Sequence, residues 1–117
     1  MAVRIVHYGD DVCNQVAALR EMGYSVSECV SLAELHAAMV GVMRADAVAI
    51  AESNGTVPDQ VVSLVRATSA VPLILFQSEN PQYSDAEFDL VIPCASTAEE
   101  WADNFAELIA RSIKRNH

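Results

Sequence analysis

The sequence is poor in positive charge. Seven Lys and Arg residues stand against 16 Asp and Glu residues, so the formal net charge is −9. A chain of this charge repels phosphate backbones and anionic lipid headgroups at long range, which argues against direct binding of nucleic acid or a membrane. The basic residues Arg111, Lys114 and Arg115 cluster where cations complement the last carbonyl groups of a helix.

Cysteine, glycine and long apolar runs are also scarce. Cys13, Cys29 and Cys94 show no Cys-x-x-Cys or Cys/His spacing, which indicates buried free thiols in a reducing compartment. Gly9 and Gly55 are isolated, so neither a dinucleotide fingerprint nor a P-loop is present, and we expect no cofactor. No run approaches the roughly 20 apolar residues of a membrane span, and the amino end is typical of a strand rather than of a signal peptide. We expect a cytoplasmic protein.

What the sequence does contain is an alternation of strand and helix patterns. Its 117 residues, of which 52% are hydrophobic and 20% charged, fit one globular domain over residues 1–117. Five strand patterns alternate with five helix patterns. This alternation predicts right-handed crossovers and a parallel sheet covered on both faces. We therefore predict a doubly wound α/β domain of flavodoxin-like order 2-1-3-4-5.

The strands are predicted from short apolar and β-branched runs. The central run, residues 47–51, is followed by the polar residues 52–55, which should leave the sheet at the edge where open α/β folds carry their sites. Residues 71–76 form the most apolar strand, whereas residues 24–30 alternate and are expected at a sheet edge. The remaining strands are predicted at residues 3–8 and 89–92.

The helices are predicted from capping residues and from apolar side chains at helical spacing. Asp10 or Asp11 is expected to cap the first helix, and Ser31 with Glu34 forms a capping box for the second. The third begins near Thr56 with a proline in its first turn. Residues 81–87 hold only a short polar helix. The last helix starts after a second capping box at residues 97–100, runs to about residue 115, and is expected to bury Trp101, Phe105, Leu108, Ile109 and Ile113.

This layout resembles the receiver domain of bacterial response regulators, the CheY-like fold. The resemblance spans the chain and is carried by the βα arrangement, the acidic turn after the first strand, residues 45–51 and 71–77, and the proline after the fifth strand. Similarity to this family implies an aspartate at the end of the third strand that accepts a phosphoryl group beside Mg²⁺. Acids after the first strand, a serine or threonine after the fourth, and a lysine before the proline would complete that site.

The central positions of that site depart from the family pattern. The phospho-accepting aspartate falls on Ala51, the hydroxyl residue on Gln77, and the lysine on Ile92. An alanine methyl group cannot form an acyl phosphate, and isoleucine cannot pair with phosphoryl oxygens. The resemblance therefore implies a degenerate receiver, or pseudo-receiver, that is not an enzyme and is not phosphorylated at the usual position.

The acidic residues near this pocket leave a second interpretation open. The family's acidic pair falls on Gly9 and Asp10, or one place later on Asp10 and Asp11. Glu52 is expected to be a solvated first loop residue, but a bulge at the strand exit would let it enter the old pocket. Asp10, Asp11 and Glu52 would then form a weak cation site or an unconventional switch, although helix capping explains at least one aspartate without metal.

The resemblance also implies a docking function. In the receiver family, the face built from the fourth helix, the fifth strand and the fifth helix commonly binds partners or forms a dimer. Here that face corresponds to parts of residues 80–87, 89–94 and 99–111, and the candidate docking residues are Tyr83, Phe88, Val91 and Trp101. We expect a two-component signalling module that binds a signalling protein or a second copy of itself. A flavodoxin-like protein or enzyme that binds a small anion is the third alternative.

Overall fold

The computed structural model describes residues 3–9, 14–41, 45–52, 58–77, 88–93 and 96–115. The predicted short helix at residues 81–87 lies outside these ranges. No helix in the described ranges is long and apolar enough to cross a membrane. The elements are β1 (Arg4–Tyr8), α1 (Gln15–Glu21), β2 (Ser25–Cys29), α2 (Leu32–Val40), β3 (Ala47–Ala51), α3 (Pro58–Thr68), β4 (Leu73–Phe76), β5 (Leu90–Ile92) and α4 (Ala98–Arg115).

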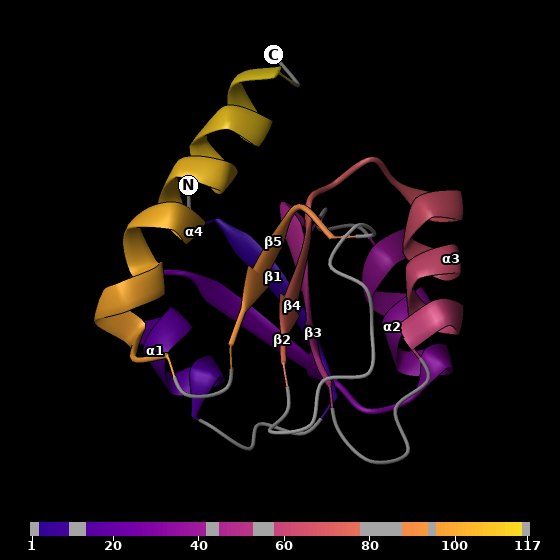
Figure 1. The fold of residues 1–117 in the computed structure, drawn as a ribbon. Coiled ribbons are helices and arrows are strands. Elements are labelled where there is room, and N and C mark those ends of the chain that lie inside the picture. The colour runs from indigo at the N-terminus through magenta and orange to yellow at the C-terminus, as the bar shows by residue number, and fades with distance from the viewer. Residues whose placement is uncertain are drawn as a thin grey trace.

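The five strands form one parallel sheet in the order β2-β1-β3-β4-β5 (Figure 1). This is the predicted flavodoxin-like, CheY-like arrangement. β3 is buried along its whole length, as expected for a central strand with helices on both faces. β2 lies at the edge and carries exposed positions, which confirms the prediction made from its weaker apolar pattern.

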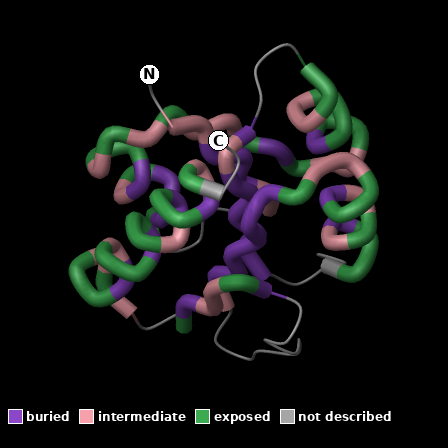
Figure 2. Tube along the Cα trace, turned by 90° about the horizontal axis from the view of Figure 1, so that it is seen from above, coloured by how far each residue is buried: buried purple, intermediate pink, exposed green. Residues whose placement is uncertain are grey.

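Helices cover both faces of the sheet (Figure 2). Because strand side chains alternate between faces, Val6, Val48 and Leu73 pack toward α2 and α3, while their neighbours pack toward α1 and α4. Figure 2 shows the buried sheet between helices whose outer sides are exposed. The carboxyl ends of the strands therefore meet at one edge of a sandwiched sheet, which is the edge expected to carry a site.

Two aspartates fix the strand register at the amino edge of the sheet. The Asp46 carboxylate, just before β3, accepts the Arg4 backbone N–H at 2.8 Å, and the Asp46 N–H donates to the Arg4 carbonyl at 2.8 Å. Asp89, just before β5, makes the same two hydrogen bonds with Leu73 of β4. Its carboxylate accepts the Leu73 N–H and its N–H donates to the Leu73 carbonyl, both at 2.8 Å. A one-residue slip of either strand would break these paired bonds.

The first helix begins differently from the prediction. Asp10 and Asp11 lie outside the described residues, and α1 starts at Gln15 after Asn14. Asn14 has a φ of 56° and makes no side-chain capping bond, so the predicted aspartate cap is wrong for this start. Asparagine tolerates this left-handed backbone conformation better than most residues do. The predicted end is confirmed, because Gly23 follows the helix with a φ of 95°.

The second helix begins where the sequence predicts, whereas Thr56, the predicted start of the third, lies outside the described residues. The Ser31 hydroxyl accepts the Glu34 N–H at 3.2 Å and donates to the Glu34 carboxylate at 3.3 Å. The capping box thus forms, but the glutamate meets the serine hydroxyl instead of the predicted serine amide. Pro58 is the first residue of α3, where its missing N–H costs no helical bond.

The last helix docks through an aromatic cluster. Trp101, Phe105 and Ile109 are buried on the face of α4 that meets the sheet. The Trp101 ring lies 5.3 Å from Phe76 and 5.7 Å from Phe105 between centroids, both in edge-to-face arrangements. Such pairs add about 0.5–1.5 kcal/mol each beyond the area they bury. Of the five residues that the sequence predicts to be buried on this helix, Trp101, Phe105 and Ile109 are buried, whereas Leu108 and Ile113 are only partly buried.

Candidate functional site

The positions corresponding to the receiver pocket lie at the carboxyl edge of the sheet. Ala51 ends β3 and stands beside Phe76, the last residue of β4. Gly9 directly follows β1, and Gln77 directly follows β4. The sequence therefore places these three residues correctly at the edge where ligands of open α/β sheets bind.

Gly9 and Ala51 pack directly against each other. Gly9 has a φ of 106°, and a Cβ added to it would lie 2.7 Å from the Ala51 carbonyl oxygen and 3.3 Å from the Ala51 Cβ. Ala51 is only 1% exposed. The structure thus leaves no room for a side chain at position 9 without moving the end of β3. Under the resemblance, Ala51 stands where the family has the phosphoryl acceptor, and Gly9 stands where it has the first acid if the acidic pair falls on Gly9 and Asp10.

The other two pocket positions are joined through their backbones. The Gln77 N–H donates to the Ile92 carbonyl at 2.8 Å, which extends the contact between β4 and β5. The Ile92 side chain is buried in the core on the α4 side of the sheet. The position of the family's lysine therefore contributes apolar packing instead of a cation. Gln77 is partly exposed and carries a neutral amide.

Glu52 corrects one prediction. The sequence predicts a solvated loop residue, but Glu52 is only 5% exposed. Its N–H donates to the Phe76 carbonyl at 2.9 Å, so pairing with β4 continues one residue past β3. Asp10 and Asp11, the other two residues of the predicted cation site, lie outside the described residues. Within the described ranges, no three His, Cys, Asp or Glu side chains gather as metal ligands.

The structure contains a buried polar pair, His7 and Gln15, that was not predicted from the sequence. His7 of β1 is fully buried, and Gln15 in the first turn of α1 is nearly so. The Gln15 Nε2 lies 3.2 Å from the His7 Nε2. An amide nitrogen only donates, so the imidazole Nε2 accepts in this arrangement. The pair ties the start of α1 to the sheet, and the only sequence signal for it is a histidine inside an apolar run.

Cys29 is a buried free thiol, as predicted. Burial raises the pKa of the Cys29 thiol, the Glu34 carboxylate raises it further, and the Arg4 guanidinium opposes them. Arg4 crosses from β1 to its neighbours, with nitrogen atoms 3.3 Å from the Ser27 Oγ and 3.4 Å from the Ala38 carbonyl oxygen. The raised pKa keeps Cys29 a neutral core side chain and a poor nucleophile. Cys13 and Cys94 lie outside the described residues.

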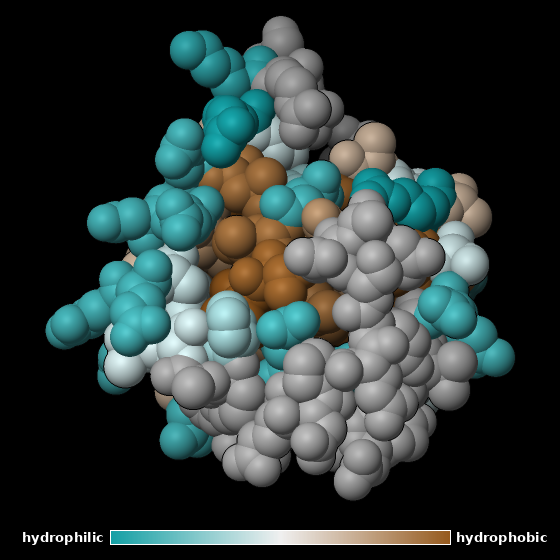
Figure 3. Space-filling view, viewed as in Figure 1, coloured by the Kyte–Doolittle hydropathy of each residue, from teal (hydrophilic) through white to brown (hydrophobic). Residues whose placement is uncertain are grey.

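The predicted docking residues divide between core and surface. Trp101 and Phe88 are 6% and 9% exposed and pack within the chain, so little of either side chain is available for contact with a partner. Both bury their rings against the sheet, which competes with contact to a partner. Tyr83 lies outside the described residues. Val91 remains partly exposed, and Figure 3 shows hydrophobic surface over β5 and beside α4, bordered by hydrophilic side chains.

A hollow of about 520 Å³ lies between the start of β5 and the second half of α4. It is lined by Asp89, Leu108, Arg111 and Lys114. Asp89 also faces Arg66 of α3 at 4.0 Å, and Arg111 pairs with Glu107 one turn back at 3.3 Å. The hollow therefore combines an apolar side chain with charged groups of both signs on an exposed face.

Comparison with known proteins finds likeness only at the level of the fold. No family model and no curated protein matches the sequence. The structure is similar to the N-terminal domain of a response regulator/sensory box/GGDEF protein from Carboxydothermus hydrogenoformans, with a TM-score of 0.78 and 12% identity over 97% of this chain and 99% of that one.

It is also similar to a CheY-like response regulator receiver domain from Methylobacillus flagellatus, with a TM-score of 0.70 and 15% identity over 92% of this chain and 99% of that one. An adenylate cyclase structure from Rhodopirellula baltica aligns with a TM-score of 0.73 and 13% identity over 96% and 90% of the two chains. Identities this low show the fold alone. The chain has the CheY-like fold of response regulator receiver domains.

Proposed function

We propose that this protein is a receiver-like signalling module that is not phosphorylated at the usual position and acts by binding another protein. The contact between Gly9 and Ala51 carries the proposal, because it fills the positions of one metal-binding acid and of the phosphoryl acceptor. The fold similarity to receiver domains supports the signalling role.

The chemistry of phosphoryl transfer supports the same conclusion. The reaction needs a nucleophile and cationic groups that neutralise charge on the transferred group. Ala51 supplies only a methyl group, and Ile92 places an apolar side chain in the core where the family has a lysine. The scaffold is kept without these groups, so its remaining use is recognition by surfaces that the fold holds in place.

The face formed by β5 and α4 is the best-supported docking surface. Leu90, Val91 and Leu108 are partly exposed there, beside the hollow bordered by Asp89 and Arg111. Interfaces commonly combine an apolar centre with a polar rim. The partner is a signalling protein or a second copy of the chain, and we place the protein in the cytoplasm, where Cys29 stays reduced.

An NMR titration tests the loss of phosphorylation. We expect no saturable amide shifts at Gly9, Ala51 and Gln77 when Mg²⁺ is added with beryllofluoride, or when a small phosphodonor is added. A receiver domain with an intact aspartate pocket, treated in parallel, shows that the reagents are active. Saturable shifts clustered at these three residues would contradict the proposal.

The burial of Glu52 favours a second candidate, an altered cation-dependent switch. A carboxylate that is 5% exposed next to Ala51 is a group that a cation could stabilise, with Asp10 and Asp11 as further oxygen ligands. This candidate predicts that Mg²⁺ or Ca²⁺ alone shifts the Glu52 amide and raises the melting temperature. Glu52→Gln should abolish both effects, and an unchanged response in that variant would reject the candidate.

A further inference from the structure

β2 forms one edge of the sheet, with β1 as its neighbour on the inner side. The Ser25 N–H donates at 2.8 Å to the residue before β1, and the Cys29 carbonyl accepts at 3.0 Å from the residue after it. Because successive residues of a strand direct their backbone groups to opposite sides, Val26 and Glu28 direct theirs away from the sheet. A row of outward backbone groups of this kind is a template for a further strand.

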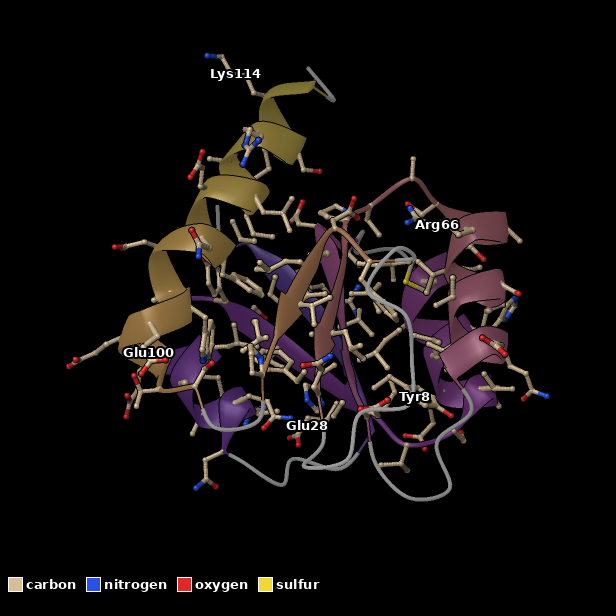
Figure 4. All side chains as sticks on the ribbon, viewed as in Figure 1. Tyr8, Glu28, Arg66, Glu100 and Lys114 are labelled. Carbon is tan, nitrogen blue, oxygen red and sulfur yellow. The ribbon has the colours of Figure 1, made fainter. Side chains whose placement is uncertain are left out.

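Arg20 of α1 covers this outer edge. Its Nη2 lies 3.3 Å from the Val26 carbonyl oxygen and 3.3 Å from a Glu28 carboxylate oxygen, so one guanidinium group donates to both outward-facing residues. Figure 4 shows Glu28 near the carboxyl end of β2. The rigid fork of donors in a guanidinium group suits a bridge between two acceptors. The side chain of Arg20 therefore holds a backbone carbonyl that an added strand would need.

The sequence of β2 and its flanks favours pairing with another strand. Residues 24–30 contain no proline or glycine, and Glu28 is their one charged residue. Val30, directly after β2, is 68% exposed. Short segments with β-branched and aromatic residues and little charge are the ones that pair edge to edge when an edge is accessible. A residue that covers the edge of such a segment keeps it from associating.

We propose that Arg20 closes the outer edge of β2, and that the strand it excludes is β2 of a second copy of this chain. Antiparallel pairing about a two-fold axis through Ser27 places Val26 opposite Glu28 of the second copy. These two residues would exchange both of their backbone hydrogen bonds, and each exchange occurs twice. The Val26 carbonyl that accepts from Arg20 is one of the acceptors that this pairing requires.

The same register brings apolar side chains together. Tyr24 falls opposite Val30 of the second copy, so an aromatic ring would cover an exposed β-branched side chain. The segment is thus complementary to itself, and Arg20 is what keeps the edge closed in the wild type. β2 and β5 lie at opposite edges of the sheet, so closure of the β2 edge is independent of docking at the face of β5 and α4.

The double variant Arg20→Ala/Glu28→Gln opens the edge. It loses one positive and one negative charge, so the net charge stays at −9. Alanine favours the helix, and exposed ion pairs contribute little to stability, so circular dichroism should show a folded protein. Sedimentation equilibrium should give an average mass roughly double that of the wild type at the same concentration.

Hydrogen exchange locates the association. The outward Val26 and Glu28 amides should exchange quickly in the wild type and slow down in the double variant as its concentration rises, because a paired strand protects them. Arg20→Ala alone is a second variant and should increase the mass by less. In that variant the two Glu28 carboxylates lie diagonally across the new pair and repel each other.

Two controls separate edge pairing from general association. Arg111→Ala/Glu107→Gln removes another exposed pair at 3.3 Å with the same unchanged net charge, and it should keep the wild-type mass. Arg20→Ala/Glu28→Pro should also keep the wild-type mass. The Glu28 N–H faces outward, so proline removes no hydrogen bond to β1 but takes a donor from the open edge.

An unchanged mass with quick exchange at Val26 and Glu28, in both Arg20→Ala/Glu28→Gln and Arg20→Ala, would overturn the proposal. Association of Arg20→Ala/Glu28→Pro or of Arg111→Ala/Glu107→Gln to the extent of the opened variant would overturn the β2 edge as its site.

Discussion

Gly9 holds a backbone conformation, with a φ of 106°, that residues with side chains rarely adopt, and its Cα faces the end of β3. Two separate effects therefore disfavour any residue with a side chain at position 9: the positive φ and the contact with the end of β3. Gly23 has a similar φ of 95° but nothing within 4 Å of an added Cβ. These two glycines allow the effects to be measured apart.

We predict that Gly23→Ala costs about 1–3 kcal/mol of unfolding free energy through torsional strain alone. Gly9→Ala should cost clearly more, because its Cβ would also lie 2.7 Å from the Ala51 carbonyl oxygen. Urea denaturation of both variants gives the comparison. Equal losses would mean that the contact with Ala51 relaxes without cost.

Cys29 predicts a loss of stability in alkaline solution. Burial, helped by Glu34, raises the pKa of this thiol in the folded protein, so between the unfolded and folded pKa values only the unfolded chain releases the proton. The contribution of the neutral Cys29 thiol to the free energy of unfolding is therefore complete below about pH 8.5. It is lost as the pH rises through the pKa of the thiol in the folded protein. Burial raises the pKa of Tyr24 and adds an effect of the same sign at higher pH.

Urea denaturation under reducing conditions at several pH values between about 7 and 10 measures this effect. Cys29→Ala should be less stable throughout but should lose less free energy as the pH rises. A wild type and variant with parallel pH profiles would show that Cys29 does not contribute.

The burial and surroundings of single residues were harder to predict from the sequence than the elements or the fold. Ala51, Gln77 and Ile92 could be placed because the strand pattern fixes where each strand ends. Glu52 was misplaced because pairing with β4 continues one residue beyond the apolar run. Trp101 was predicted both in the core and on a docking face, and its contacts with Phe76 and Phe105 assign it to the core.

At the scale of elements, the strands were predictable and the helix starts only in part. Burial on both faces gives β3 and β4 continuous apolar runs, which sequence displays directly. Ser31 marks the start of α2 because its hydroxyl chemistry is local. The start of α1 at Gln15 was missed, since its N-cap Asn14 is a left-handed residue with no side-chain capping bond and leaves no such local signature.

The paired bonds of Asp46 and Asp89 make a prediction at this scale. Asp46→Ala and Asp89→Ala should each cost about 1–3 kcal/mol, because each removes a charged acceptor from a strand amide. Asp103→Ala, an exposed change on α4, should cost less than either. Urea denaturation measures the losses, and hydrogen exchange at the Arg4 and Leu73 amides should quicken in the matching variant. Unchanged exchange would contradict this role.

At the scale of the molecule, the two cores on opposite faces of the sheet depend on different helices. Phe105 is fully buried and contacts Trp101 in the core that α1 and α4 cover. The order of the sheet was predictable because alternating strands and helices permit few arrangements. The surface beside β5 could not be predicted in the same way, because it depends on which side chains from separate elements come together.

Phe105→Ala should cost about 3–5 kcal/mol and loosen α4 from the sheet. Trp101 is the single tryptophan of the chain, so its fluorescence reports this core directly, and its emission should shift toward longer wavelength in the variant. Ala106→Ser, an exposed change on the next residue, should leave the spectrum and stability nearly unchanged. A variant spectrum identical to wild type would show that α4 remains docked.

The aspartates that bracket Arg4 and Leu73 lie at the amino edge of the sheet, opposite the edge where Gly9 and Ala51 meet. Strand register is thus secured at one end of the molecule, while the residues that chemistry would require stand at the other. Side chains at the carboxyl edge can therefore be replaced without loosening the strand register, provided that the replacement does not crowd the contact between Gly9 and Ala51.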